Sequence, residues 1–408
     1  MSENTATIPS PMASTLDARA LFATLAGLCG SLVAIGLARF AYTPLIPPLI
    51  QAHWFTSSQA VTLGAANFAG YLAGALLGRP IANALSNRHA LRLLMLIATA
   101  AFFACAYPLS VSWFFAWRFA SGVSGGAIMV LVATTILPYI PPARRGFASG
   151  MIFLGLGLGI AASGTIIPRL LQLGLKNTWI GLGVFAAILT AVSWFGWPGS
   201  APAAPAPGAG TQPVRRGNTA LRVLYAQYAA NALGLVPAMV LLVDYVARGL
   251  GRGAETGAGY WVLYGVAAIA GPVVCGNVAD RTGFGPAYRI ALLLQAIAVA
   301  TLALSGNPIL IGVATVALGI FTPGIVPLVL GRIQEMVPHD HIEQRAVWSR
   351  ATTAFALFQA LAGYGYSYLF TLSHNNYALI FLCGAVALAL ALTADILTGR
   401  KPQPVAAS

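Results

Sequence analysis

The chain has 408 residues, of which 58% are hydrophobic and only 8% are charged, and its mean hydropathy is +0.79. A soluble globular protein carries charge on about a quarter of its residues, so this composition excludes an ordinary soluble fold. The net charge of +13 does not indicate a nucleic-acid partner, because the excess arginine falls mainly in alternate loops between apolar segments.

Apolar segments long enough to cross a bilayer recur along the whole chain. A membrane-spanning helix needs about 20 apolar residues. Segments of this kind lie at residues 20–50, 58–82, 90–110, 112–140, 147–173, 177–198, 219–247, 257–279, 287–305, 308–337, 345–372 and 376–398. The pattern predicts an all-α membrane protein with twelve transmembrane helices. Residues 1–19 lack a basic start and a small-residue cleavage site, so we expect no cleaved signal peptide.

The first predicted span ends with the stretch GLARFAYTPLIPPLI, residues 36–50. Arg39 lies inside this apolar segment, where an ionisable side chain is costly and is commonly functional. Tyr42 follows it and offers an amphipathic contact. The prolines of the stretch predict a kink that releases backbone carbonyls toward a cavity.

The second, fourth and fifth spans add polar and small residues. Asn67 lies in the middle of the second span, and Arg118 opens the stretch RFASGVSGGA in the fourth. The small residues after Arg118 allow helices to approach closely. The glycines of the fifth span, residues 155, 157 and 159, follow no strand, so we interpret them as helix-packing residues rather than as a nucleotide-binding loop.

One long polar interruption, residues 199–217, reads GSAPAAPAPGAGTQPVRRG. A segment so rich in Pro, Ala and Gly cannot form a packed core and suits a semi-extended linker. We therefore expect an N-terminal six-helix bundle at residues 1–198, a cytoplasmic linker at 199–217 and a C-terminal six-helix bundle at 218–408.

The seventh span carries Gln227 and Asn231 on one helical face, and Asp244 near its outer end. Arg39 and Arg118 also lie in the outer thirds of their spans, so the three charges fall at one depth. If these three spans face one another, the arrangement predicts a site for an organic anion, with Asp244 as a proton carrier or an arginine partner. Snorkelling to the interface and a structural ion pair are the alternatives, the latter because Arg248 follows Asp244 by one turn.

The loop after the eighth span reads GNVADRTG, residues 276–283. Gly276 is expected to allow close helix packing, Asp280 and Arg281 supply charged partners, and Gly283 permits a tight reversal. The alternative is an ordinary cytoplasmic turn.

Two later spans hold further polar residues. Arg332 and Glu335 are three residues apart near the inner end of the tenth span, which indicates a local pair or an inner gate. Gln359 lies in the middle of the eleventh span. Like Asn67, Gln227 and Asn231, it either binds solute or donates a hydrogen bond to a neighbouring helix.

The two halves of the chain match at a displacement of 197 positions. The matching residues are Gly74 with Gly271, Asn83 with Asp280, Arg92 with Arg289, Gly122 with Gly319, and Pro141 with Pro338. Two parallel six-helix repeats and the GNVADRTG loop resemble the major facilitator superfamily. The first span and the stretches GYLAGALL at 70–77 and FQALAGYGY at 358–366 resemble its YbfB-like branch.

This resemblance implies that spans 1, 4, 7 and 10 line a central cavity and that the 276–283 loop latches the two halves in one transport state. In relatives, an arginine at the position of Arg118 is linked to proton coupling or to substrate binding. The resemblance therefore places Arg39, Arg118 and Asp244 around one cavity.

We therefore expect a secondary transporter that moves a small organic solute, such as an organic anion, by alternating access, with the proton as coupling ion. A multidrug or sugar efflux permease and a transporter-like sensor are the alternatives. No triad, Walker loop or metal-ligand spacing occurs in the sequence, so we expect no enzymatic activity, cofactor or bound metal.

The distribution of basic residues sets the expected orientation. Only four basic residues fall in the loops of one side: Arg169, Lys176, Arg248 and Arg252. The richer side belongs in the cytoplasm, together with both termini. We expect a monomer that spans the lipid bilayer of a bacterial cytoplasmic membrane many times.

Overall fold

A computed structural model of the protein describes residues 17–141, 144–199, 219–337 and 341–399. The regular secondary structure of these residues is helical throughout. The helices of the first half are α1 (Ala18–Ser31), α2 (Ala38–Phe40), α3 (Tyr42–Gln51), α4 (Ser57–Leu85), α5 (Asn87–Cys105), α6 (Val111–Ile136), α7 (Arg145–Leu171) and α8 (Leu175–Ser193). Those of the second half are α9 (Thr219–Asp244), α10 (Gly253–Thr282), α11 (Phe284–Leu304), α12 (Pro308–Met336), α13 (His341–Leu372) and α14 (Tyr377–Gly399).

The first predicted span is one continuous helical segment with an irregular centre. A π-helical stretch, Leu32–Leu37, joins α1 to α2, and a single residue, Ala41, separates α2 from α3. Such π-helical turns are rare and frequently mark functional sites. The irregularity therefore falls immediately before Arg39.

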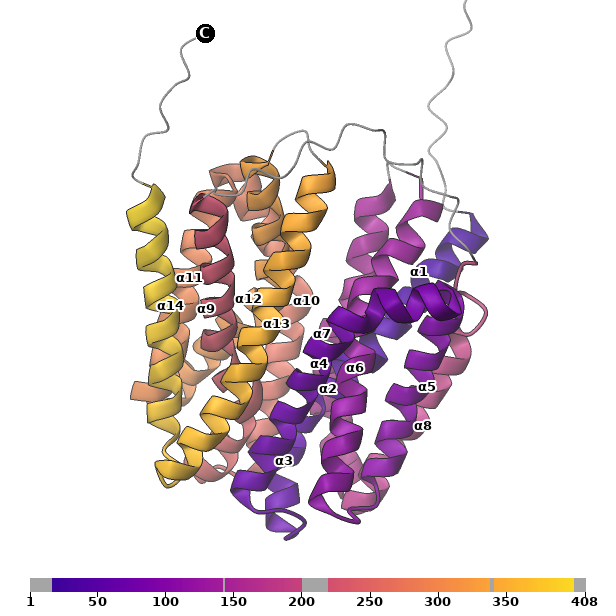
Figure 1. Ribbon diagram of the computed structural model, residues 1–408. Helices are drawn as coiled ribbons and strands as arrows, with labels where there is room; N and C mark the ends of the chain where they lie inside the picture. Colours follow the sequence, from indigo (N-terminus) through magenta and orange to yellow (C-terminus); the bar gives the residue numbers. More distant parts are fainter. Residues whose placement is uncertain (1–16, 142–143, 200–218, 338–340, 400–408) are drawn as a thin grey trace, which may run out of the picture.

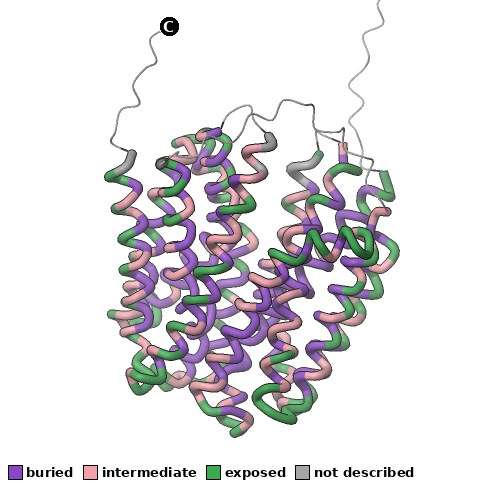
Figure 2. The backbone as a smooth tube through the Cα atoms, in the orientation of Figure 1, coloured by how far each residue is buried: buried purple, intermediate pink, exposed green. Residues whose placement is uncertain are grey.

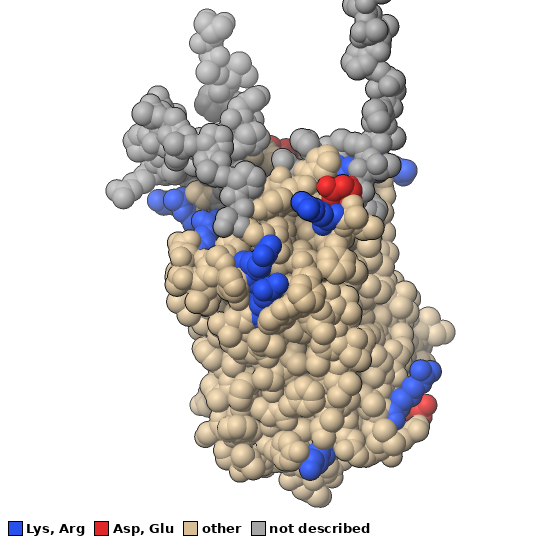
Figure 3. Space-filling view, turned by 90° about the vertical axis from the view of Figure 1, so that its right-hand side faces the viewer, with Lys and Arg blue, Asp and Glu red and all other residues tan. Residues whose placement is uncertain are grey.

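Eleven helical segments in the described part of the chain are long and apolar enough to cross a membrane. The remaining predicted span corresponds to α13, whose 32 residues include many polar side chains. Figure 3 shows an uncharged band between basic and acidic residues gathered toward the two ends of the molecule. These observations confirm an all-α integral membrane protein.

The helices gather into two groups, α1–α8 and α9–α14, which we call the first and the second bundle (Figure 1). Their ribbons converge at the end that contains α3 and diverge toward the end where the C-terminus lies. We call the former the contact end. Residues 200–218, which include most of the expected linker at 199–217, lie outside the described residues, so the domain boundaries remain a prediction.

Small residues bring pairs of helices together in the same way in both bundles. A Cβ atom on Gly74 or Gly122 would overlap the facing backbone of α6 or α4, at Val123 and Asn67. Gly271 and Gly319 stand in the same relation to Ile320 and Tyr264 of α12 and α10. All four of these contacts are related by the displacement of 197 positions, so the repeat in the sequence is also a repeat of helix packing.

Buried residues occupy the faces on which the helices meet, and exposed ones lie on the outer faces and ends (Figure 2). The glycine-rich α7 contributes to this packing on two sides. Gly159 lies against Gly36 of the first span, and Gly157 lies against Ile269 of α10 in the other bundle. The interpretation of the α7 glycines as helix-packing residues is therefore confirmed.

The close approach of α4 and α6 can be tested by adding one methyl group. Gly122→Ala is expected to lower stability by about 1–3 kcal/mol, because the added Cβ has no room against the α4 backbone. Gly259→Ala is the matched control, since a Cβ there meets no atom within 4 Å. Thermal unfolding of the purified proteins in detergent measures the difference, and equal unfolding temperatures would contradict the packing described.

Candidate functional site

A small cavity lies between the two bundles at the position where the first helix is interrupted. Its walls come from the first span, α4, α6 and α9, and the lining residues are Arg39, Phe40, Tyr42, Thr43, Gly64, Phe68, Arg118, Met239 and Val240. The free space admits a group of about the size of one water molecule. Two of the three charged residues expected at this site therefore do meet.

Arg118 is bound to the irregular first helix. Its side chain is 3% exposed, and its Nη1 donates a hydrogen bond of 2.5 Å to the carbonyl oxygen of Ala38. The guanidinium group also lies 4.3 Å from the ring centre of Tyr42, whose hydroxyl donates to the carbonyl of Ala60 in α4. Arg118 thus links α6 to the first span.

Arg39 is buried among aromatic rings. It is 9% exposed, and its guanidinium carbon lies 4.5 Å, 4.9 Å and 5.5 Å from the ring centres of Phe68, Tyr71 and Phe40. Its Nε and Nη2 atoms have no hydrogen-bond partner among the described residues. Cation–π contacts offset part of the cost of burying this charge, but they leave its donors unsatisfied.

The buried carboxylates of the described chain are Asp244 and Asp395, and both are bound to other arginines. Asp244 pairs with Arg248 at 2.5 Å. Asp395 pairs with Arg289 and, at 2.6 Å, with Arg332. Within the described residues, Arg39 and Arg118 form no salt bridge, so the cavity carries two positive charges that no carboxylate balances.

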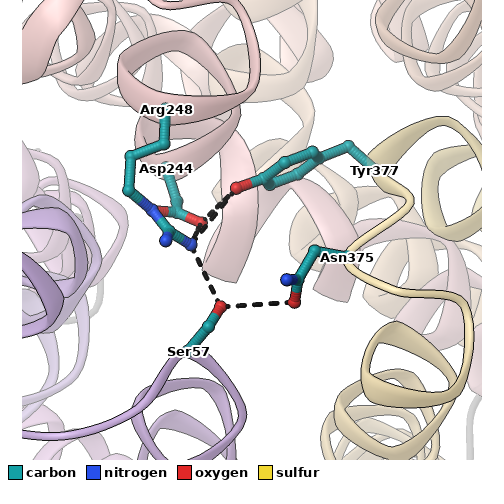
Figure 4. Close-up of polar contacts among 5 residues, drawn as sticks. All are labelled: Ser57, Asp244, Arg248, Asn375 and Tyr377. Atoms are coloured by element: carbon teal, nitrogen blue, oxygen red, sulfur yellow. Dashed lines mark hydrogen bonds and ion pairs between the residues drawn. The ribbon is translucent and has the colours of Figure 1, made fainter.

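Asp244 was expected beside these two arginines, and the structure places it in a different polar cluster (Figure 4). Its second oxygen accepts hydrogen bonds from Arg248 Nη2 at 2.8 Å and from the Tyr377 hydroxyl at 2.6 Å. Arg248 also donates to Ser57 of α4 at 3.0 Å, and Ser57 donates to Asn375. Asp244 therefore belongs to a connection between the bundles at the contact end, and its local pair with Arg248 is observed.

Hydroxyl pairs extend this connection along α4 and α13. Thr62 and Ser367 lie 2.7 Å apart, and Thr371 donates to Ser58 at 2.8 Å. These residues are spaced four apart on each helix, so they share one helical face. Neutral hydroxyl pairs can exchange their partners for water at little cost, so each of these contacts adds little to the stability of the interface.

The four neutral candidates divide into two pairs. Asn67 donates to the carbonyl oxygen of Arg118 at 3.4 Å, and Gln359 lies 3.9 Å from the sulfur of Met239. Both therefore contact residues that line the cavity. Gln227 and Asn231 instead donate to Asp395 at 2.9 Å and to Gln295 at 2.6 Å. The second pair therefore makes hydrogen bonds between helices inside the second bundle.

The cluster around Asp395 was not anticipated from the sequence. An acidic residue in the last apolar span was the available signal, because such a residue is rarely left without a partner. The expected local pair of Arg332 and Glu335 is wrong: Arg332 binds Asp395, and Glu335 accepts a hydrogen bond of 3.1 Å from the backbone N–H of Phe284. Glu335 thus caps the start of α11.

The 276–283 loop agrees only in part with expectation. Gly283 has φ of 83° and forms the reversal between α10 and α11. A Cβ on Gly276 would meet no atom within 4 Å, so the close packing expected there is absent. Asp280 and Arg281 are exposed, and neither forms a salt bridge within the described chain. A latch role for the loop remains a prediction.

Residues 31–396 match the family described as "Uncharacterised MFS-type transporter YbfB". The chain is 30% identical over 122 residues to the 4-hydroxybenzoate transporter PcaK of Acinetobacter baylyi, a match that covers 30% of this chain and 27% of that relative. The chain therefore matches only about a quarter of the relative's length.

Two solved structures share the fold. A D-xylose–proton symporter has a TM-score of 0.68 at 16% identity, over 92% of this chain and 96% of its own. The xylose transporter XylE from E. coli, in a partially occluded inward-open conformation, has a TM-score of 0.68 at 16% identity, over 95% and 98% of the two chains. At this identity the similarity concerns the fold alone.

The Asp395 cluster provides a stability test. Asp395→Ala is expected to lower stability by about 2 kcal/mol, because it leaves two partly buried arginines, Arg332 and Arg289, without their carboxylate. The exposed substitution Asp280→Ala serves as control. Chemical or thermal unfolding in detergent measures both, and an unchanged stability for Asp395→Ala would show that the triad contributes little.

Proposed function

The chain belongs to the family of MFS-type transporters typified by YbfB, so it is a secondary transporter of the major facilitator superfamily, and we propose that its substrate is a small organic anion bearing a carboxylate. The observation that carries this proposal is the unbalanced positive charge of Arg39 and Arg118. An isolated charge buried in protein or membrane is costly, and an anionic solute would supply the missing partner.

The substrate named for one relative supports a carboxylate as the substrate of this transporter. The name of PcaK describes it as a transporter of 4-hydroxybenzoate, and that compound is an aromatic carboxylate. The aromatic rings beside Arg39, those of Phe40, Phe68 and Tyr71, suit the apolar part of such a solute. This match covers 30% of this chain and 27% of the relative. The main support for a carboxylate substrate is therefore the pair of buried arginines.

Transport is proposed to proceed by alternating access at the bacterial cytoplasmic membrane, with both termini in the cytoplasm. The cavity lies between the bundles, and α9 covers it through Met239 and Val240. Separation of the bundles at the contact end would expose the cavity there. The distribution of basic residues supports the orientation, which places the contact end on the outer side.

A proton is the proposed coupling ion, with Asp244 as its carrier. Asp244 holds Arg248, and Arg248 in turn donates to Ser57 across the bundle interface. Protonation would remove the negative charge that fixes Arg248, and the connection to α4 would weaken. Proton uptake and opening of the contact end would then be linked through one ion pair.

Transport of an organic anion is tested in proteoliposomes that contain the purified protein. Wild type is expected to exchange labelled benzoate across the membrane, and the double variant Arg39→Met/Arg118→Met is expected to lose at least about tenfold in rate, since each charge-assisted hydrogen bond contributes about 1.5–3 kcal/mol. Arg79→Met, an exposed arginine, is the control. Binding without exchange would indicate a sensor, and stabilisation only by lipophilic cations would favour multidrug efflux.

If Asp244 carries the coupling proton, its substitution should abolish proton-driven accumulation without abolishing exchange. Asp244→Asn keeps the shape of the side chain but removes the charge, so benzoate exchange is expected to continue while a proton gradient no longer drives accumulation. Glu255→Gln, exposed near the same end of the molecule, is the matched control. Accumulation by Asp244→Asn at the wild-type level would place the coupling proton elsewhere.

A further inference from the structure

The two buried arginines have different bonding, which the charge of the cavity alone does not reveal. Building on the proposed organic-anion function, we infer that Arg39 alone binds the substrate carboxylate, through a two-point contact by its Nε and Nη2 atoms, and that Arg118 is a positioning residue that holds the first helix. The carboxylate of the substrate would then be held by one edge of the Arg39 guanidinium group.

The unpartnered atoms of Arg39 form a ready binding edge. Nε and Nη2 lie side by side on the guanidinium plane, and both lack a partner in the described structure. Two parallel N–H groups at this spacing match the two oxygens of a carboxylate. Arg39 is also 9% exposed and lines the cavity, so this buried edge belongs to a side chain that borders the space between the bundles.

Arg248 illustrates what such an edge binds in this protein. It uses the same two atoms, Nε and Nη2, to hold the two oxygens of Asp244, at 2.5 Å and 2.8 Å. In Arg39 the corresponding pair has no carboxylate. The missing partner therefore has the shape and charge of an aspartate side chain, which favours a planar carboxylate over a tetrahedral anion or a neutral solute.

Aromatic rings pack around the guanidinium group of Arg39. The rings of Phe68 and Tyr71 lie within 5 Å of the guanidinium carbon, and the adjacent Phe40 packs at 6.1 Å from Trp261 of α10. A side chain held between rings loses little further conformational entropy when it binds. These contacts support a preformed site rather than a mobile charge.

Arg118 has already used part of its donor capacity for structure. Its Nη1 donates to Ala38, the residue directly before Arg39, and its face lies over Tyr42, directly after the interruption at Ala41. Both contacts flank Arg39 in sequence. Arg118 thus determines the path of the backbone that carries the Arg39 side chain.

Access to the binding edge involves the second bundle. The cavity beside Arg39 has room only for a water-sized group, and Met239 and Val240 of α9 form one wall. The Thr43 hydroxyl donates to the carbonyl of Met239 at 2.6 Å, which holds α9 against α3. A carboxylate fits only when α9 moves away from this wall, so binding would accompany movement between the bundles.

The test compares conservative and neutral substitutions in the full-length protein reconstituted in nanodiscs. Calorimetry with sodium benzoate measures affinity, and benzenesulfonate serves as a tetrahedral anion of the same charge. Arg39→Lys keeps the charge but lacks the two-point edge, so its benzoate Kd is expected to rise about tenfold or more, and its preference for benzoate over benzenesulfonate is expected to fall. Arg118→Lys still donates to Ala38, so its benzoate Kd is expected to rise by less than that of Arg39→Lys, with the preference for benzoate retained. Arg79→Lys is the control.

A ligand-free measurement separates the two roles independently. Arg39→Met removes an unpaired buried charge, so the unfolding temperature without anion is expected to rise. Arg118→Met removes the bond to Ala38 and is expected to lower it. Normal benzoate binding by Arg39→Lys together with loss of binding by Arg118→Lys would overturn the assignment. The assignment would also be overturned if Arg39→Met lowered the unfolding temperature.

Absence of benzoate and benzenesulfonate binding by wild type would instead overturn the organic-anion function, and with it the assignment of Arg39 as a carboxylate ligand. The two failures are distinguishable, because the first is a reversed pattern among variants and the second is a property of the unaltered protein.

Discussion

The cost of a charge or polar group without a partner inside the bilayer shapes this structure more than any other interaction. Water is absent from the hydrocarbon core, so such groups must find partners within the protein. Asp244 and Asp395 do so through Arg248 and through Arg289 with Arg332. Arg39 differs from these carboxylates, because within the described residues it forms no salt bridge and two of its buried nitrogens, Nε and Nη2, have no hydrogen-bond partner. The proposed site rests on this difference, and its proposed ligand is a planar carboxylate.

The internal repeat places equivalent helices in equivalent contacts, but the two bundles use a shared arginine differently. Arg92 of α5 donates to the backbone carbonyl of Trp194 just after α8, where the end of a helix is negative. Its counterpart Arg289 binds the side chain of Asp395 in α14. Each arginine thus connects the last helix of its bundle to the equivalent neighbouring helix, α5 in the first bundle and α11 in the second. Asp395 therefore stabilises the packing of the second bundle, and it does not line the cavity.

The contact between the bundles combines three kinds of interaction, each with a different consequence. Glycines allow α7 and α10 to lie close together through Gly157 and Ile269. Hydroxyl pairs join α4 to α13, and water can replace them at little cost. The ion pair of Arg248 with Asp244 is the charged element of the contact and depends on one titratable group. In the proposed transport cycle this contact would separate, with water replacing the hydroxyl partners.

The sequence by itself determined the class of fold, the approximate positions of the spans and the repeat, and it predicted Arg39 and Arg118 as site residues, because apolar length and buried charge are local properties of a chain. Only the tertiary structure decided which polar residues meet. Asp244 lies away from the cavity, and Gln227 and Asn231 of α9 bind Asp395 and Gln295 on other helices. Arg332 pairs with Asp395, whereas Arg39 has no salt bridge within the described residues. The reason is that depth in a span is readable from sequence, whereas the rotation of each helix and its choice of neighbour depend on packing with helices far away along the chain.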